Sequence, residues 1–205
     1  MSEPLDERAA PNGRLRFETL ISDVSARMIT CPLEEVDREI EAALERVRVH
    51  FSADQCGLLR IEQDRDRVCV THAAYAEGLD RVSGDLNLAD LYPHLYARLL
   101  EGEVVVVPRA DDLPPTDRES SRRMGIRSFL DIPLRVGGGV RFILALNALH
   151  EEREWPGSSI PRVRLVGEMF VNALERRRSE LLLRESEARQ RVAAEASGAG
   201  FWSLD

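Results

Sequence analysis

The chain has 205 residues, 43% of them hydrophobic, which is enough for one domain of ordinary size with extensions. Its net charge is −8 at pH 7, so we expect neither nucleic acid nor an anionic membrane as a partner. All 28 residues of the lysine–arginine class are arginines, which excludes Schiff-base chemistry and a Walker-type phosphate lysine.

The cysteines indicate a reducing compartment. Cys31, Cys56 and Cys69 are odd in number and widely spaced, and no CxxC pair occurs, so neither a disulfide framework nor a zinc site is expected. The polar, acidic start of the chain differs from a signal peptide. No apolar run is long enough for a membrane span. The sequence therefore predicts a cytoplasmic protein without membrane insertion.

The first part of the chain predicts a flexible end followed by two helices. Residues 1–13 are polar and read as a flexible N-terminus. A helical pattern begins at Arg14, and Pro32 marks the start of a second helix. The apolar residues of the first helix recur at spacings of three and four: Phe17, Leu20, Ile21, Val24 and Met28. Those of the second form one stripe: Leu33, Val36, Ile40, Leu44, Val47 and Phe51.

The middle of the chain alternates short strands and short helices. The strands expected there are 56–62, 68–75 and 103–107, with a turn at 64–66 between the first two. The helices expected there are 88–101, which Gly102 ends, and 117–124, which Gly125 ends. Residues 76–86 and 111–115 read as loops.

The stretch Gly125–His150 predicts the centre of a sheet. Ser128–Val136 and Val140–Leu149 read as two strands joined by a glycine turn. Apolar residues occupy both parities of the second strand, so we expect it to be covered on both faces. Val140, Phe142, Leu144 and Leu146 would face one side, and Ile143, Ala145 and Leu149 the other.

The last part predicts a helix that leaves the domain. The helix starts at Ile160 and is expected to run to about Ala196, with a broad apolar face up to Glu175. Beyond Glu175 only a narrow seam of Leu174, Leu181 and Ala188 remains, at a spacing of seven, which is typical of a coiled coil. We therefore expect a homodimer through the terminal helices, with Leu174 and Leu181 in its interface.

Three local sequences, in this element order, resemble the GAF domain family over residues 16–177. They are VVVVPRADDLPP, MGIRSFLDIPL and the closing helix WPGSSIPRVRLVGEMFVNALERRRSE. The tail, LLRESEARQRVAAEASGAGFWSLD, resembles the opening of a PAS domain. GAF followed by PAS through a continuous helix is similar to bacterial sensor histidine kinases. The resemblance divides the chain into a flexible start (1–13), a GAF sensor domain (14–176), a linker helix (177–196) and the start of a PAS domain (197–205).

The resemblance implies an α/β (α+β) fold. An antiparallel sheet would have the first and last helices on one face and a ligand pocket on the other. It also implies a sensory module without catalytic residues in a two-component signal-transduction protein. Such a module would bind a small ligand and relay the signal through the C-terminal helix to PAS and kinase domains in the same chain. The alternative is a ligand-free dimerisation module, in which the bulk of Phe142 fills the pocket.

Six residues are expected to line that pocket: Tyr92, Leu95, Met124, Phe129, Asp131 and Asn147. Such a cavity suits a small, mostly apolar ligand with a cationic or hydrogen-donating group. Asp131 lies within an apolar strand, and its parity places it with Phe129. A buried carboxylate needs a partner, and Arg118, Arg122, Arg123 or a ligand would supply one. The other interpretation is that Asp131 stands at an edge position or faces solvent.

Other GAF chemistries match less well. The four histidines show no metal-ligand spacing, and we predict no metal and no cofactor; His94 is the best placed for a haem contact. Neither Cys56 nor Cys69 stands beside a histidine, as bilin-attaching cysteines usually do. Asn147 fits the first position of the cyclic-nucleotide motif, but Ala148 replaces its lysine. A reductase of the methionine-sulfoxide type would require cysteines in the pocket loops, but no cysteine follows Cys69.

Overall fold

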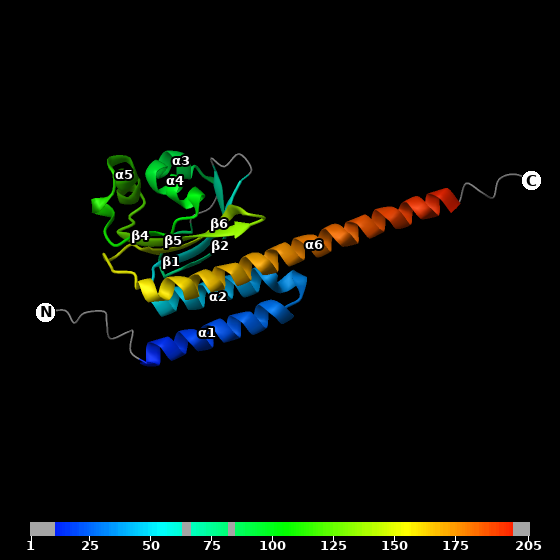
Figure 1. Cartoon of the computed structure of the whole chain (residues 1–205), viewed down its shortest axis with the longest axis horizontal. Coiled ribbons are helices and arrows are strands. Elements are labelled where there is room, and N and C mark those ends of the chain that lie inside the picture. The colour runs from blue at the N-terminus through cyan, green and yellow to red at the C-terminus, as the bar shows by residue number, and fades with distance from the viewer. Residues whose placement is uncertain (1–10, 63–66, 82–84, 199–205) are drawn as a thin grey trace, which may run out of the picture.

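A computed structural model describes residues 11–62, 67–81 and 85–198 of the chain (Figure 1). The expected turn at 64–66, the first ten residues of the expected flexible start and the PAS-like tail from 199 lie outside the described residues.

The described strands form one antiparallel sheet in the order β3-β2-β1-β6-β5-β4. Its strands are β1 (Gln55–Ile61), β2 (Val68–Tyr75), β3 (Asp85–Leu86), β4 (Val105–Val107), β5 (Ser128–Val136) and β6 (Gly139–Ala148). The β5–β6 hairpin is central, as predicted, and β6 pairs with both β1 and β5. Only β3 was not expected, because two residues leave no periodic pattern.

Helices cover both faces of the sheet (Figure 1). One face carries α2 (Val36–Phe51) and α6 (Ile160–Gly198), and α1 (Pro11–Thr30) packs mainly on these two helices. The other face carries α3 (Leu88–Leu91), α4 (Pro93–Glu101) and α5 (Pro115–Arg123), which we call the roof. Three short 3-10 helices complete the described elements: Leu33–Glu35, Ala110–Asp112 and Gly157–Ser159.

Several element boundaries differ from the sequence prediction by a few residues, and two of the differences concern helices α1 and α3. Helix α1 begins at Pro11, three residues before the expected Arg14, so residues 11–13 are helical. The single helix expected over 88–101 is two helices, because Tyr92 adopts φ −139° and ψ 58° ahead of Pro93. A residue that precedes proline is disfavoured in the α conformation, and proline itself suits the first turn of a new helix.

Burial on both faces of β6 gives the protein two cores. The helix-side core, between the sheet and α1, α2 and α6, includes Leu58, Leu144 and Phe170. The roof-side core, between the sheet and the roof, includes Ile143, Tyr96 and other residues of α4. The expectation that β6 is covered on both faces is confirmed.

A β-bulge changes the face on which one residue lies. Leu134 pairs with Phe142, but the next residue, Arg135, pairs with Val140, so Arg141 is an extra residue in β6. The extra residue moves Val140 to the roof side, although Phe142 stays on the helix side. The predicted parity was therefore wrong for Val140, because alternation cannot reveal a bulge.

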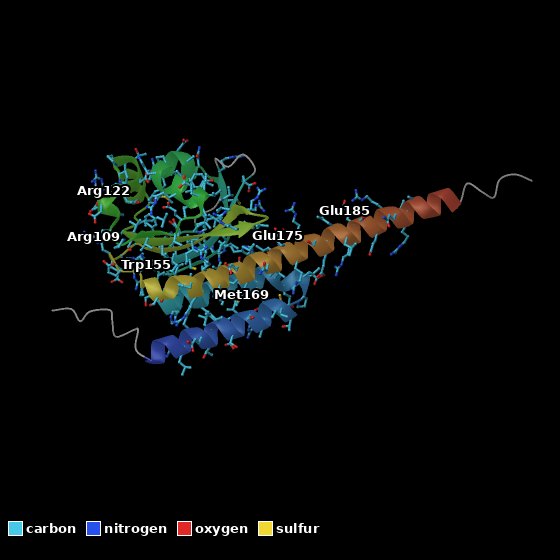
Figure 2. All side chains as sticks on the ribbon, viewed as in Figure 1. Arg109, Arg122, Trp155, Met169, Glu175 and Glu185 are labelled. Carbon is cyan, nitrogen blue, oxygen red and sulfur yellow. The ribbon has the colours of Figure 1, made fainter. Side chains whose placement is uncertain are left out.

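Gly167 allows α6 to lie close to the sheet. A Cβ atom at this position would stand 2.8 Å from Leu134 Cδ1 and 3.2 Å from Leu144 Cδ2. Beyond this contact α6 leaves the domain: Figure 2 shows Glu175 beside the sheet and Glu185 on the projecting part. The same helix is therefore a core element at its start and projects from the domain at its end.

Leu144 tests whether the hairpin is central to stability. Its side chain is fully buried, so we expect Leu144→Ala to reduce the free energy of unfolding by ~2–5 kcal/mol. Val106→Ala, on the edge strand β4, should change it by much less, because Val106 is 37% exposed. Denaturant unfolding checks both, and equal losses would contradict a core centred on β6.

Candidate ligand cavity

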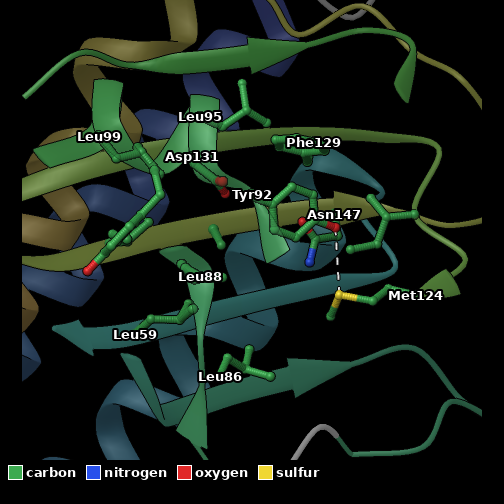
Figure 3. Close-up of a pocket in the computed structure, with 14 residues that line it drawn as sticks. Leu59, Leu86, Leu88, Tyr92, Leu95, Leu99, Met124, Phe129, Asp131 and Asn147 are labelled. Atoms are coloured by element: carbon green, nitrogen blue, oxygen red, sulfur yellow. Dashed lines mark hydrogen bonds between the residues drawn. The ribbon is translucent and has the colours of Figure 1, made fainter. Parts of the chain in front are cut away.

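A cavity of about 80 Å³ lies between the roof and the sheet (Figure 3). All six residues predicted from the sequence line it. The remaining lining residues are almost all apolar: Leu59, Leu86, Leu88, Tyr96, Leu99, Ile126, Ile143 and Ala145. Its volume is several times what one water molecule needs, but it is small beside pockets for drug-sized ligands.

Strand pairing sets the floor of the cavity. Phe129 and Asp131 stand two residues apart on β5, so both lie on the face toward the roof. Asp131 pairs with Ala145 on β6 and with Val105 on β4. Asn147, opposite Phe129, donates from its side-chain Nδ2 to Gln55 Oε1 at 3.1 Å. The predicted parity of Asp131 with Phe129 is therefore confirmed.

Tyr92 joins the roof to the floor. It stands at the break between α3 and α4, and its hydroxyl donates to Met124 Sδ at 3.6 Å (Figure 3). The same oxygen accepts from Ser121 Oγ at 3.4 Å, and the ring meets Phe129 edge-on. Burial raises the pKa of Tyr92 to about 12, so its hydroxyl keeps its proton.

Charged side chains from other elements hold both ends of α4. At its start, the fully buried carboxylate of Asp117 accepts from the Leu95 backbone N–H at 3.1 Å and meets His94 Nδ1 at 3.1 Å. At its end, Arg135 Nη2 donates to the Glu101 carbonyl at 2.9 Å. These contacts satisfy backbone groups that a helix leaves unpaired at its ends.

Sequence reasoning missed Asp117. The one available signal was indirect: Tyr92, the residue before Pro93, cannot cap a helix with a side-chain oxygen, so the cap had to come from elsewhere. His94, the best candidate for a haem contact, has a side chain that is 59% exposed and does not line the cavity.

Asp131 is the one carboxylate of the cavity lining, and it has no hydrogen-bond or ion-pair partner among the described residues (Figure 3). Two of the arginines considered as partners bond elsewhere: Arg122 pairs with Asp111 at 2.8 Å, and Arg118 donates to the Asp111 carbonyl. Burial against apolar neighbours raises the pKa of Asp131 to about 7. The side chain is half-buried on the cavity wall, and β5 lies between β4 and β6, so Asp131 is not on an edge strand.

Several other side chains lie away from the cavity. Phe142 packs in the helix-side core, so it does not fill the cavity, and this support for a ligand-free module was wrong. Cys56 lies in the same core, where burial raises the pKa of its thiol, and no described cysteine lines the cavity. Trp155 is also buried there, with its Nε1 donating to Ser128 Oγ at 2.8 Å.

Among the described residues, no group of three or more His, Cys, Asp and Glu side chains is placed to hold a metal ion. None of the helices in the described part is both long and apolar enough to cross a membrane.

Solved structures share this fold. The phycoerythrobilin-bound GAF domain of a cyanobacterial phytochrome is 15% identical with a TM-score of 0.69, covering 80% of this chain and 97% of that one. The bacteriophytochrome RpBphP3 of R. palustris is 13% identical with a TM-score of 0.75, covering 94% of this chain but 43% of that one. Residues 122 to 287 of a methyl-accepting chemotaxis protein are 16% identical with a TM-score of 0.59, covering 78% of this chain and 98% of that one.

The family assignment rests on a sequence model. None of the curated proteins compared with the chain matches it. The model described as "GAF domain" matches residues 35–176, from the start of α2 to the point where α6 leaves the sheet. With more than half of its length matched and the fold in agreement, the chain belongs to the GAF domain family.

Proposed function

We propose that this chain is the sensory part of a cytoplasmic signal-transduction protein and that it binds a small ligand in the cavity. The observation that carries the proposal is an apolar cavity with one unpartnered acid, Asp131. It lies across the sheet from α6, the helix that continues beyond the domain. Neighbours of this fold named as phytochromes and as a chemotaxis protein support a signalling role.

The cavity suits a smaller ligand than the phycoerythrobilin named for one neighbour. A linear tetrapyrrole has four rings and would not fit a space of about 80 Å³. No described cysteine lines the space to bind one covalently. The proposed ligand is therefore a compact organic molecule with an apolar body.

The polar end of that ligand is set by Asp131. With a pKa of about 7, its carboxyl group is partly ionised at neutral pH. A ligand with an ammonium group would stabilise the ionised form and supply the missing ion-pair partner. We therefore assign the ligand a cationic or hydrogen-donating group.

The proposed output is a homodimer joined through α6. Leu181, Leu182 and Leu183 are all more than half exposed on the projecting part of the helix. Leu174 packs partly against the helix-side core of its own chain, so Leu181 is the sharper test of the seam. PAS and histidine kinase domains further along the chain would receive the signal; this part of the proposal rests on the resemblance of the tail and of the linker.

A second candidate function is dimerisation without a ligand. The exposed leucines favour it, since they would be covered by a second copy whether or not the cavity is filled. Both functions include the dimer, so only a measurement of ligand binding distinguishes them.

Ligand binding is tested with three probes of one shape: isobutylammonium, isobutanol and isobutyrate. We expect isobutylammonium to bind best and to shift the NMR signals of the Leu95 and Met124 methyl groups. Asp131→Asn should weaken it about 10- to 100-fold, because a hydrogen bond to a charged group contributes ~1.5–3 kcal/mol. Glu119→Gln, which removes an exposed carboxylate from the roof, is the matched control. No shift with any probe would count against the sensor function.

Asp131 also predicts a pH dependence of stability. Its pKa is about 7 in the folded chain and near 3.8 when exposed, so the unfolded state loses the proton first as the pH rises. Stability therefore falls between about pH 4 and pH 7. Asp131→Asn removes this loss and should gain ~1–3 kcal/mol relative to the unmutated chain between pH 5 and pH 8, since cavity water reduces the full effect. Parallel unfolding profiles for the two proteins would contradict the buried position of the acid.

The dimer is tested by two adjacent substitutions. Leu181 and Leu182 are 52% and 53% exposed, but only Leu181 lies on the seam of seven-residue spacing. Leu181→Glu should dissociate the dimer in sedimentation, and Leu182→Glu should disturb it much less. The proposed dimer is wrong if the unmutated chain is monomeric, or if Leu181→Glu and Leu182→Glu have equal effects.

A further inference from the structure

Arginines attach α6 to the α1–α2 corner at the point where it leaves the domain. Arg177 Nη1 lies 2.6 Å from Asp37 Oδ2, near the start of α2. Arg176 donates to the backbone carbonyls of Ile29 and Cys31, at 3.0 and 3.4 Å. The direction of the projecting helix therefore depends on polar contacts with residues 29–37.

The second carboxylate oxygen of Asp37 contacts a residue of the sheet. Asp37 Oδ1 meets Nε2 of His72 on β2 at 2.9 Å, and His72 is only 7% exposed. The bond from Arg177 is the largest cause that keeps the pKa of Asp37 below its ordinary value, and the bond with His72 acts in the same direction. One carboxylate thus joins α2, α6 and the middle of β2.

His72 is linked in turn to a β-bulge. Its Nδ1 lies 3.0 Å from Thr71 Oγ1, and that hydroxyl donates to the Leu58 carbonyl at 2.9 Å. Leu58 pairs with His72 but Leu59 pairs with Val70, so Thr71 is the extra residue between them. Leu59, the next residue on β1, lines the cavity on the opposite face of the sheet.

We propose that Thr71, His72 and Asp37 relay changes at the Leu59 wall of the cavity to Arg177 and so to the projecting part of α6. The inference rests on the proposed sensor function, since a ligand in the cavity would contact Leu59. Each step is a contact in the structure, and the path crosses the sheet at the bulge, where the strand pairing is already interrupted. An irregular pairing shifts more easily than a regular ladder, which makes the bulge a suitable two-state element.

The Thr71 hydroxyl gives the relay two distinct states, because it has a single proton. When it donates to the Leu58 carbonyl, it can only accept from His72 Nδ1. When it turns to donate to His72 Nδ1, it releases the Leu58 carbonyl. Asp37 from α2 and Arg177 from α6 are the charged groups in contact with this site.

The test perturbs the wall without a ligand, in the full 205-residue chain. We expect Leu59→Met to shift the ¹⁵N signals of the His72 ring. It should also make amide exchange in residues 178–193 about two- to fivefold faster, the effect of weakening one partly exposed ion pair. Leu86→Met, on the cavity wall at β3 but away from the bulge, is the matched control and should do neither. Arg177→Gln should reproduce the faster exchange by itself.

Thr71→Val removes the hydroxyl and keeps the shape of the side chain. In that background Leu59→Met should no longer make amide exchange in residues 178–193 faster. The relay is wrong if the effect survives in Thr71→Val, or if Leu59→Met and Leu86→Met act alike. Should Leu59→Met fail to fold, Leu59→Ile serves in its place.

The same spectra separate this inference from the sensor function. If isobutylammonium binds in the cavity and leaves the His72 ring unchanged, the relay is overturned and ligand binding stands. If no probe binds but Leu59→Met acts through Thr71, the relay is supported and the sensor function is not.

Discussion

The burial of β6 on both faces is the constraint on which the rest of this structure depends. Ile143 and Leu144 are neighbours in sequence, but they belong to different cores. A strand with apolar side chains on both faces must be covered twice, so helices are required above and below the sheet. The helix-side layer contains α6, which packs on the sheet at its start and projects from the domain at its end. The roof-side layer consists of short segments that pack less completely, and the cavity lies beneath them.

Much of this arrangement could be predicted from the sequence. Periodic stretches such as Ser128–Val136 were located to the residue, because a long apolar strand followed by glycines has few other interpretations. All six predicted residues line the cavity, since alternation on β5 and the family resemblance pointed to the same face. The bulge at Arg141 and the two-residue strand β3 could not be predicted. Both depend on how distant segments pair, and neither leaves a repeat in the sequence.

The polar contacts were the hardest to foresee. Asp117 caps a helix that begins more than twenty residues earlier in the chain, and Asp37 meets a histidine from another element. Such pairs join positions that no local pattern connects. For Asp131 the sequence indicated an unusual acid, but only the fold shows that Arg118 and Arg122 bond to Asp111 instead. The absence of a partner is thus a property of the tertiary structure, and it is the main reason for assigning the cavity a ligand.

The two ends of α4 have a consequence for how the roof can open. A helix carries partial positive charge at its start and partial negative charge at its end. Asp117 and Arg135 place opposite charges at these ends, so displacing α4 would separate charge at both of them. Among the described residues, no charged side chain from another element bonds to α3: Asn87 caps its start from within the same turn, and Tyr92 at its end bonds to Met124 and Ser121. In the described part of the roof, α4 is therefore held by charges at both ends, and α3 is held without charged partners from other elements. A molecule entering the cavity would meet least resistance on the side of α3.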